Sequence, residues 1–359
     1  MADGQGRLLM AASGTGGHVF PALAIADHLT DWSIEWLGVA DRMESQLLAG
    51  RYPFHAIPMS GLQGSRWLAW PRTTGQLLRS VWQVRRLLQK GQFQGVLTTG
   101  GYIAAPAILA AYSLGIPVIL HESNAIPGKV TRWLGRYCRV VALGMAAAAA
   151  HLPHLPTQVV GTPVRDQFWQ PQPLADLGIP QEAVVIGVIG GSQGARGLNR
   201  IVVACAPDWL ELGAWIVHLT GETDATALEK LAPPHPRYQR YPFRSDMPAL
   251  LQRANFVVSR AGAATLAELA ATATPAILIP YPYAAEDHQY HNAQAFVAAG
   301  GGVVFRESPQ QVAAIRDYGC RWIGHPSEVA LHRQALQQTP PQQATLAMVD
   351  LLKNVLKES

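Results

Sequence analysis

Twice in this chain a short apolar run leads into a glycine-rich turn and then into a helical pattern. The first run, Leu8–Ala12, precedes SGTGGH at Ser13–His18, and the second, Val184–Ile189, precedes GGSQGARG, which begins at Gly190. A strand followed by a tight turn and a helix begins a crossover between parallel strands, and parallel sheets need helices on both faces. This repeat therefore restricts the chain to an α/β fold with two similar halves.

Further apolar runs follow each turn, and helical stretches separate most of them. We predict two Rossmann-like, doubly wound domains facing a cleft, with ligand-binding groups at the carboxyl ends of the strands. The first domain spans residues 1–162, the second spans residues 163–340, and a helix within 341–359 packs back on the first. The other predicted strands are Ile34–Leu37, Phe54–Ile57, Val96–Thr98, Val118–Leu120, Val140–Leu143, Ile216–Leu219, Phe256–Val258, Ala276–Ile279 and Val303–Phe305.

Composition narrows the class of protein. Of the 359 residues, 49% are hydrophobic and 14% are charged, which suits large buried cores and excludes a disordered chain. The net charge of +4 favours a phosphorylated ligand or an anionic surface, and we expect no nucleic-acid partner. The three cysteines are widely spaced, so we expect neither a disulfide framework nor a zinc site.

Two segments could be mistaken for targeting or membrane signals. The first residues lack the basic start and cleavage site of a signal peptide, and we expect a cytoplasmic protein. The apolar run Ile103–Leu120 is as long as a membrane span, but Gly115-Ile116-Pro117 interrupts it. We predict a buried helix followed by a buried strand there.

The first glycine-rich turn is a candidate anion site. Glycines allow the backbone to approach a ligand closely, and the start of the following helix offers unpaired N–H groups to a phosphate or diphosphate. The helix dipole also disfavours a charged imidazole at His18, so a neutral ring there could act as a base. The alternatives are a tight turn without a ligand and a packed or capping histidine. The turn is not GxGxxG, because Val19 replaces the last glycine, which argues against a dinucleotide-dependent oxidoreductase.

Two more polar clusters follow predicted strands. His121-Glu122-Ser123-Asn124 comes directly after Val118–Leu120, and Gly100-Gly101-Tyr102 comes after Val96–Thr98. Both belong at the ligand-binding edge of the first sheet, and Glu122 is a second candidate base. Ordinary loops remain the alternative for each.

The corresponding edge of the second half contains SRAGAATLAE at Ser259–Glu268. The helix-start amides could hold a phosphate while Glu268 accepts ribose hydroxyls, or Glu268 could be only a first-turn acid that complements the helix dipole. Polar residues 286–292 follow the next strand. The sequence contains no DxD pair, so we expect helix dipoles and side chains, with no metal and no cofactor, to stabilise a leaving diphosphate.

A possible membrane-facing segment lies in the first half. Trp67, Leu68 and Trp70 lie between Arg66 and Arg72, and this mixture suits the headgroup region of an anionic bilayer. The alternative is a solvated basic helix with its aromatic residues packed inward. The basic residues that continue along the predicted helix are Arg79, Arg85, Arg86 and Lys90.

Taken in order, these motifs resemble one family. It is the MurG family of UDP-N-acetylglucosamine–N-acetylmuramyl-(pentapeptide) pyrophosphoryl-undecaprenol N-acetylglucosamine transferases, and the likeness extends from Leu8 to about Phe305. The matching segments are GTGGHVFPALAIA at Gly14–Ala26, LGVADRME at Leu37–Glu44, SGLQG at Ser60–Gly64, GGY at Gly100–Tyr102, HESN at His121–Asn124, GTPVR at Gly161–Arg165, GGSQGARGLN at Gly190–Asn199 and SRAGAATLAELAA at Ser259–Ala271.

The resemblance implies a GT-B glycosyltransferase of peptidoglycan synthesis, peripheral on the cytoplasmic face of the inner membrane. The first domain would bind lipid I and the second UDP-GlcNAc, and GlcNAc transfer with inversion would give lipid II. Residues that map to donor-binding positions are Thr15, Gly16, Gly17, Asn124, Arg165, Ser192, Ala263, Ala264, Thr265, Leu266, Ala267, Glu268 and Gln289, and Arg244 maps to a backbone contact with uracil.

The sequence departs from the family pattern in three places. HESN replaces HEQN, GTPVR replaces GNPVR, and the stretch around Tyr283–Glu286 is one residue longer, which leaves the sugar ligand open between His288 and Gln289. Rival functions are another GT-B glycosyltransferase, a UDP-GlcNAc epimerase, an oxidoreductase and a binding-only protein. Fold alone does not separate these functions. The motifs favour the transferase that makes lipid II from lipid I over all four rivals.

Overall fold

The computed structural model describes residues 6–14, 16–40, 42–58, 70–174, 176–191, 195–221, 228, 231–338 and 343–357. The chain divides into two compact units. Unit 1 comprises residues 1–165 and 343–359, and unit 2 comprises residues 166–342. The first boundary therefore follows Arg165, rather than residue 162, and Arg165 belongs to unit 1.

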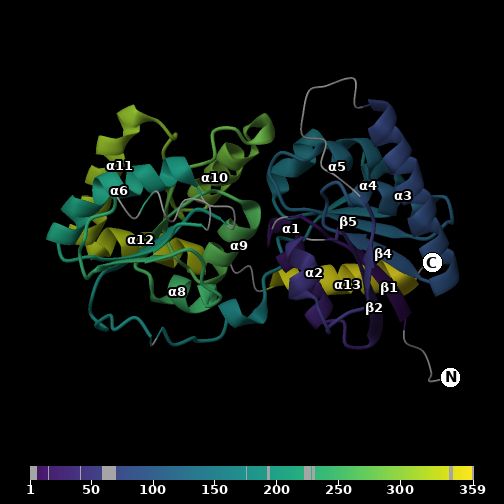
Figure 1. Cartoon of the computed structure of the whole chain (residues 1–359), viewed down its shortest axis with the longest axis horizontal. Helices are drawn as coiled ribbons and strands as arrows, with labels where there is room; N and C mark the ends of the chain where they lie inside the picture. The colour runs from purple at the N-terminus through teal and green to yellow at the C-terminus, as the bar shows by residue number, and fades with distance from the viewer. Residues whose placement is uncertain are drawn as a thin grey trace. The chain divides into compact units, whose positions relative to one another are not determined.

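Unit 1 contains a parallel sheet with the order β3-β2-β1-β4-β5-β6-β7 (Figure 1). Its strands are β1 (Gly6–Ala11), β2 (Trp32–Gly38), β3 (Phe54–Ala56), β4 (Gly95–Thr98), β5 (Val118–Glu122), β6 (Val140–Leu143) and β7 (Thr157–Val159). Its helices are α1 (Gly16–Asp27), α2 (Met43–Leu47), α3 (Trp70–Gly91), α4 (Ala104–Tyr112), α5 (Lys129–Leu134) and α13 (Gln343–Lys357).

Successive residues of β1 enter two different cores because side chains alternate across a strand. Leu8 and Met10 pack with α1 and α13 on one face of the sheet. Leu9 and Ala11 pack with α3 and α4 on the other face (Figure 1). Every residue from Leu8 to Ala12 is fully buried, which explains why the strand is a continuous apolar run.

The closing helix α13 completes unit 1. Met348 and Leu352 lie fully buried in the core that contains α1. Thr345 joins the helix to the domain boundary, since its hydroxyl accepts from the Val164 amide (3.2 Å) and donates to the Val164 carbonyl (3.1 Å).

Unit 2 repeats the order with one strand fewer, as β10-β9-β8-β11-β12-β13. One face of this sheet packs against α6, α11 and α12 through buried residues such as Trp209 and Trp322. Its strands are β8 (Val185–Ile189), β9 (Trp215–Leu219), β10 (Tyr238–Tyr241), β11 (Phe256–Ser259), β12 (Ala276–Leu278) and β13 (Gly302–Val304). Its helices are α6 (Arg196–Glu211), α8 (Met247–Arg253), α9 (Ala263–Ala271), α10 (His288–Ala298), α11 (Val312–Gly324) and α12 (Pro326–Gln337).

The sequence prediction was incomplete in two respects. It missed β7 and β10, which are edge strands whose side chains, apart from the buried Tyr238, are exposed or half-buried, and such strands leave no apolar run to detect. It also began the first helix at Val19, whereas α1 begins at Gly16. Gly16 and Gly17 therefore belong to the first helical turn, and His18 lies within the helix.

Strands β1, β2 and β3 of unit 1 are joined by a charged cluster. Glu35 of β2 accepts hydrogen bonds from Arg7 of β1 and from His55 Nε2 of β3, the latter at 2.6 Å. Burial raises the pKa of Glu35, but the bonds from His55 and Arg7 outweigh burial and hold the pKa below its ordinary value. The ionised carboxylate is therefore favoured in the folded state.

This cluster predicts acid-sensitive stability. A carboxyl group with a lowered folded-state pKa stabilises the fold above its unfolded-state pKa, and this contribution is lost as pH falls through the folded-state value. We expect Glu35→Gln to lower the free energy of unfolding by about 1 kcal/mol at pH 7 and by less as pH falls below about 4. Urea unfolding across this range measures the difference, with the exposed Glu211→Gln as control. A deficit that does not depend on pH would contradict this assignment.

Candidate active site

The polar clusters of unit 1 meet at the carboxyl edge of the sheet. Strands β1 and β4 are neighbours there, although β2 and β3 lie between them in sequence. The strand order reverses between β1 and β4, and this switch point is where open α/β sheets bind ligands. The turn after β1 carries His18, and the turn after β4 carries Thr99–Gly101.

His18 is fixed by reciprocal hydrogen bonds with Thr99. The Thr99 hydroxyl donates to the His18 carbonyl at 2.8 Å, and His18 Nδ1 lies 2.6 Å from the Thr99 carbonyl oxygen. A carbonyl oxygen can only accept, so Nδ1 carries the proton of that bond. In the neutral ring the lone pair is therefore on Nε2, which is the tautomer a base needs.

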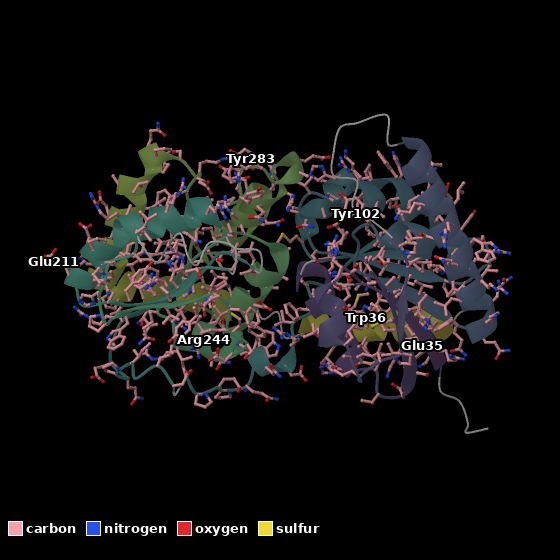
Figure 2. All side chains as sticks on the ribbon, in the orientation of Figure 1. Glu35, Trp36, Tyr102, Glu211, Arg244 and Tyr283 are labelled. Atoms are coloured by element: carbon pink, nitrogen blue, oxygen red, sulfur yellow. The ribbon has the colours of Figure 1, made fainter. Side chains whose placement is uncertain are left out.

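Two glycines lie close to the His18 ring. Gly100 has φ +89° and Gly101 has φ +74°, in the left-handed region where residues with side chains are strained. A Cβ on either glycine would lie 3.5 Å from an atom of the ring. The turn thus brings backbone close to the imidazole, and Tyr102, 43% exposed, follows it (Figure 2).

The first glycine-rich turn is held from beneath by Glu44 of α2. This side chain is fully buried, and its Oε1 accepts from the Ser13 hydroxyl and from the Val39 amide at 3.2 Å. Its Oε2 accepts from the Gly14 amide at 3.4 Å. Trp36 of β2 adds a bond from its indole N–H to the Ala12 carbonyl at 2.8 Å. The segment Ala12–Gly14 is therefore fixed by side chains of the neighbouring strand–helix unit.

Glu122, the second candidate base, is occupied by its own loop. Its carboxylate accepts from the Asn124 amide (3.1 Å), the Asn124 side chain (3.0 Å), the Gly128 amide (2.9 Å) and the Thr131 hydroxyl (2.6 Å). Only 6% of the residue is exposed. These bonds fix the start of α5 and the orientation of Asn124, which favours a structural role for Glu122 and leaves His18 as the better placed base.

His121 forms the inner layer of the same cluster. Its Nε2 donates to the Gly161 carbonyl at 2.9 Å, and its Nδ1 accepts from the Ser123 hydroxyl at 3.2 Å. Complete burial lowers the pKa of His121, because desolvation disfavours the charged ring. Ser123, where the sequence departs from the family pattern, thus has a defined partner in a neutral histidine.

Arg165 lies beside the first helix. Its guanidinium stacks on Phe20 of α1, 4.1 Å from the ring centre. Phe20 follows His18 by two positions, so this stacking brings a positive charge to the start of α1.

In unit 2 the switch point lies between β8 and β11, and α9 begins directly after β11. Gly262 caps α9 without a side-chain bond, so the amides of Ala263, Ala264 and Thr265 have no side-chain cap. Glu268 is the sixth residue of the helix, and the view of it as a first-turn acid is wrong. It lies one turn above Ala264 and Thr265, on the same helical face.

The structure distinguishes His288 from Gln289. His288 Nδ1 donates to the Ala285 carbonyl at 2.9 Å and thereby closes its own turn. Gln289 Oε1 accepts from the amides of Tyr281 (3.0 Å) and Ala261 (3.3 Å), which ties α10 to the loops after β12 and β11. The amide NH2 of Gln289 has no partner among the described residues, so Gln289 is the better candidate ligand.

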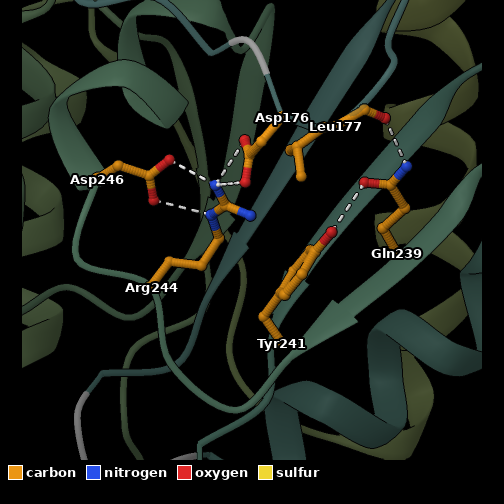
Figure 3. A network of polar contacts seen from close by, with 6 residues as sticks. All are labelled: Asp176, Leu177, Gln239, Tyr241, Arg244 and Asp246. Carbon is orange, nitrogen blue, oxygen red and sulfur yellow. Dashed lines mark hydrogen bonds and ion pairs between the residues drawn. The ribbon is translucent and has the colours of Figure 1, made fainter.

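Arg244 is held by two carboxylates (Figure 3). Its Nε and Nη2 bond Asp246 at 2.8 and 2.5 Å, and Nη2 bonds both oxygens of Asp176 at 3.0 Å. These bonds raise the pKa of Arg244 above its ordinary value. These bonds occupy Nε and Nη2 and hold the guanidinium against the two carboxylates, which favours a ligand contact through the backbone over one through the side chain.

Comparison with known proteins identifies the family. Residues 8–143 match the glycosyltransferase family 28 N-terminal domain, and residues 185–317 match the family's C-terminal domain. The chain belongs to glycosyltransferase family 28. A relative from Synechococcus sp. (strain JA-2-3B'a(2-13)), a UDP-N-acetylglucosamine–N-acetylmuramyl-(pentapeptide) pyrophosphoryl-undecaprenol N-acetylglucosamine transferase, is 62% identical over 98% of this chain and 96% of its own.

Solved structures place the family-28 chain among GT-B folds. The crystal structure of Acinetobacter baumannii MurG matches with a TM-score of 0.76 and 29% identity, over 97% of this chain and 99% of that one. A putative UDP-N-acetylglucosamine 2-epimerase from Listeria monocytogenes reaches a TM-score of 0.72 at 11% identity, over 99% and 98% of the two chains. The second match shows a shared fold alone. The predicted fold class and family are confirmed.

Two predicted site residues cannot be placed, and two residues that support the site were not predicted. Thr15 and Ser192 lie outside the described residues. Thr99 and Glu44 were not predicted as site residues, although Glu44 ends the LGVADRME motif. Within the described part, no group of three or more His, Cys, Asp or Glu side chains is placed to hold a metal ion.

Arg260 is a further unpredicted residue of this edge. It donates to the carbonyls of Ile279 (2.9 Å) and Pro280 (3.2 Å) and pairs with Glu307 at 2.5 Å. The Glu307 carboxylate lies against Gly197, where a Cβ would be 1.9 Å from Oε1. The start of α6, which follows the second glycine-rich turn, therefore has a carboxylate of its own chain beside it.

The buried Glu44 generates a test in this family-28 enzyme. Glu44→Gln keeps the shape but places an amide N–H against a backbone or hydroxyl donor, which costs about 1–3 kcal/mol for a buried polar group. We expect that loss in urea unfolding of unit 1, together with faster hydrogen exchange at the Gly14 and Val39 amides. Ser45→Ala, which removes only an exposed bond to the Arg42 carbonyl, is the control. If the Gly14 amide of Glu44→Gln exchanged hydrogen at the wild-type rate, the proposed support of this turn by Glu44 would be refuted.

Proposed function

We propose that this enzyme transfers GlcNAc from UDP-GlcNAc to undecaprenyl-pyrophosphoryl-MurNAc-pentapeptide, lipid I, and produces lipid II with inversion. The observation that carries the proposal is the His18 ring, oriented by Thr99 beside a glycine-rich helix start at the switch point of unit 1. The printed activity of the 62% identical relative supports the choice of substrates. The reaction is a step of peptidoglycan synthesis, so the enzyme serves cell-wall growth and division.

Unit 2 supplies the residues for the donor. The free amides at the start of α9 bind the diphosphate, and Glu268 accepts hydrogen bonds from the ribose hydroxyls. The Arg244 backbone contacts uracil, and Gln289 offers its NH2 to the sugar. The remaining proposed donor contacts come from Ser192 and from Thr15, Gly16, Gly17, Asn124 and Arg165.

The chemistry is a single displacement. An acceptor hydroxyl attacks the anomeric carbon, the bond from that carbon to the diphosphate breaks, and UDP leaves from the opposite face. His18 Nε2 takes the hydroxyl proton, since Glu122 is already bonded to four donors of its own loop. The start of α9 and the Arg165 guanidinium stabilise negative charge that develops on the diphosphate.

The acceptor is lipid-linked, and we propose that α3 contacts the cytoplasmic leaflet of an anionic membrane. Leu78 is 65% exposed and Trp82 is 59% exposed, so this part of the helix does not pack its aromatic residue inward. Arg86 stacks on Trp82 at 5.3 Å, and Arg79 and Lys90 are also exposed, whereas Arg85 bonds the Ser113 carbonyl at 2.8 Å. Trp67, Leu68 and Arg66 lie outside the described residues, as do the side chains of Trp70 and Arg72.

The described part of the chain contains no helix that could span a bilayer. Exposed indole and aliphatic groups next to basic residues favour the interface with anionic lipid, where each cation adds to the attraction.

Incubation of the purified enzyme with UDP-GlcNAc and lipid I tests the function. We expect lipid II and UDP in equal amounts, with a β-linked GlcNAc from an α-linked donor. An epimerase would instead convert the nucleotide sugar without an acceptor. Conversion of UDP-GlcNAc that does not require lipid I would therefore reject the proposal.

Two variants separate the base from the donor ligand. We expect His18→Ala to lower kcat by about 10²–10⁴-fold with little change in the KM for UDP-GlcNAc, because proton transfer is lost. Glu268→Ala should act mainly through donor affinity and raise this KM by about tenfold or more, because hydrogen bonds to a charged group are lost. Steady-state kinetics measure both, with the exposed Glu182→Ala as control. Wild-type constants in both variants would remove these assignments.

Liposome flotation tests the membrane surface. We expect Leu78→Ala/Trp82→Ala to bind vesicles containing anionic lipid at least about tenfold more weakly than wild type, because two exposed apolar anchors are lost. Leu212→Ala, in which an exposed leucine of unit 2 is removed, should bind like wild type. If the wild-type enzyme bound vesicles equally well with and without anionic lipid, the proposed membrane contact of α3 would be contradicted.

A further inference from the structure

A pocket of about 180 Å³ lies at the amino edge of the unit 2 sheet. Val184 and Asn255, which directly precede β8 and β11, line one side of it, and Val329, Ala330 and Arg333 of α12 line another. The glycine-rich turns and the start of α9 follow the carboxyl ends of the same strands. The pocket is therefore separate from the proposed donor site, and no step of the proposed reaction uses it.

The polar groups of the pocket wall include N–H groups that have no acceptor among the described residues. Trp322 also lines the pocket; it is 1% exposed, and its indole Nε1–H has no partner among the described residues. The Asn255 side-chain oxygen already accepts from the Val185 amide at 2.8 Å, so only its NH2 remains. The Trp322 N–H group is almost wholly covered by the protein and does not face an occupant, whereas the half-buried Asn255 leaves its NH2 open to one.

Arg333 adds a positive charge, and no acidic side chain of the described residues forms an ion pair with it. Its Nη2 donates to the carbonyls of Ala254 (3.0 Å) and Asn255 (3.3 Å), which closes the end of α8. Burial lowers the pKa of Arg333, and no carboxylate of the described residues pairs with it to offset that burial. The N–H groups on Nε and Nη1 are left for another acceptor, and a guanidinium binds a carboxylate best through two such groups.

The rest of the lining is apolar and contains no acid. Val184, Val329, Ala330 and Pro326 present only hydrocarbon to the space. Water could accept a hydrogen bond from an N–H group. It would supply no negative charge to the guanidinium, and it would leave the apolar side chains in contact with water. An occupant that suits both surfaces has one negative group and a short hydrocarbon tail.

We propose that this pocket binds a small monocarboxylate with a short apolar tail. The carboxylate accepts from Arg333 and from the Asn255 NH2, and the tail packs against Val184, Val329 and Ala330.

Sodium n-butyrate is the probe, titrated into uniformly ¹⁵N-labelled enzyme at constant ionic strength. The indole resonance of Trp322, assigned by its absence in Trp322→Phe, should move saturably as the pocket fills. n-Butanol has the same tail without the charge and should cause no saturable shift. An equal response to n-butanol, or no saturable response to n-butyrate, would overturn the proposal.

Two variants test the two surfaces separately. Arg333→Gln should weaken n-butyrate binding at least about tenfold, because a charged hydrogen-bond partner is lost. Ala330→Phe fills the space but leaves the Arg333 bonds to Ala254 and Asn255 intact, and binding should disappear while the folded spectrum persists. If Arg333→Gln fails to fold, Ala330→Phe alone decides, and wild-type affinity in that variant refutes the site.

Discussion

Both sheets of this enzyme are parallel and covered by helices on two faces, so polar side chains can reach a ligand only where the strands end. In unit 1 even adjacent residues of β1 are fully buried in opposite cores. The chemistry is thereby confined to turns, and the turns that matter are those on either side of the strand-order reversal. The same constraint operates in unit 2, where α9 begins directly after β11.

At this edge the enzyme uses backbone to orient side chains. Thr99 receives a bond from His18 Nδ1 and returns one to the His18 carbonyl, so the tautomer of the ring is set by the turn after a different strand. Gly100 and Gly101 can lie against the ring because they adopt positive φ angles. Glu44 and Trp36 hold the other side of the turn. Such support suits the base that we propose for His18, because a base must hold one orientation before the acceptor binds.

Several acidic residues at these edges bond to groups of their own chain. Their presence therefore indicates how the fold is held and does not by itself indicate an activity. Glu122 is bonded to its own loop, Glu307 pairs with Arg260, and Asp176 and Asp246 hold Arg244. An epimerase shares this fold at 11% identity, so the sheets themselves do not define a reaction. The family follows instead from the sequence match over both domains and from the 62% identical relative.

The sequence by itself determined the order of the elements, the two glycine-rich turns and the family. Buried parallel strands are continuous apolar runs, whereas the half-exposed edge strands β7 and β10 carry no such signal and were missed. Only the tertiary structure decided which groups meet. His18 and Thr99 lie 81 positions apart, and Glu44 lies 31 positions from Ser13. Their contacts depend on which strands become neighbours in the sheet. The apolar periodicity of the sequence describes each strand or helix separately, so it does not encode the order of the strands.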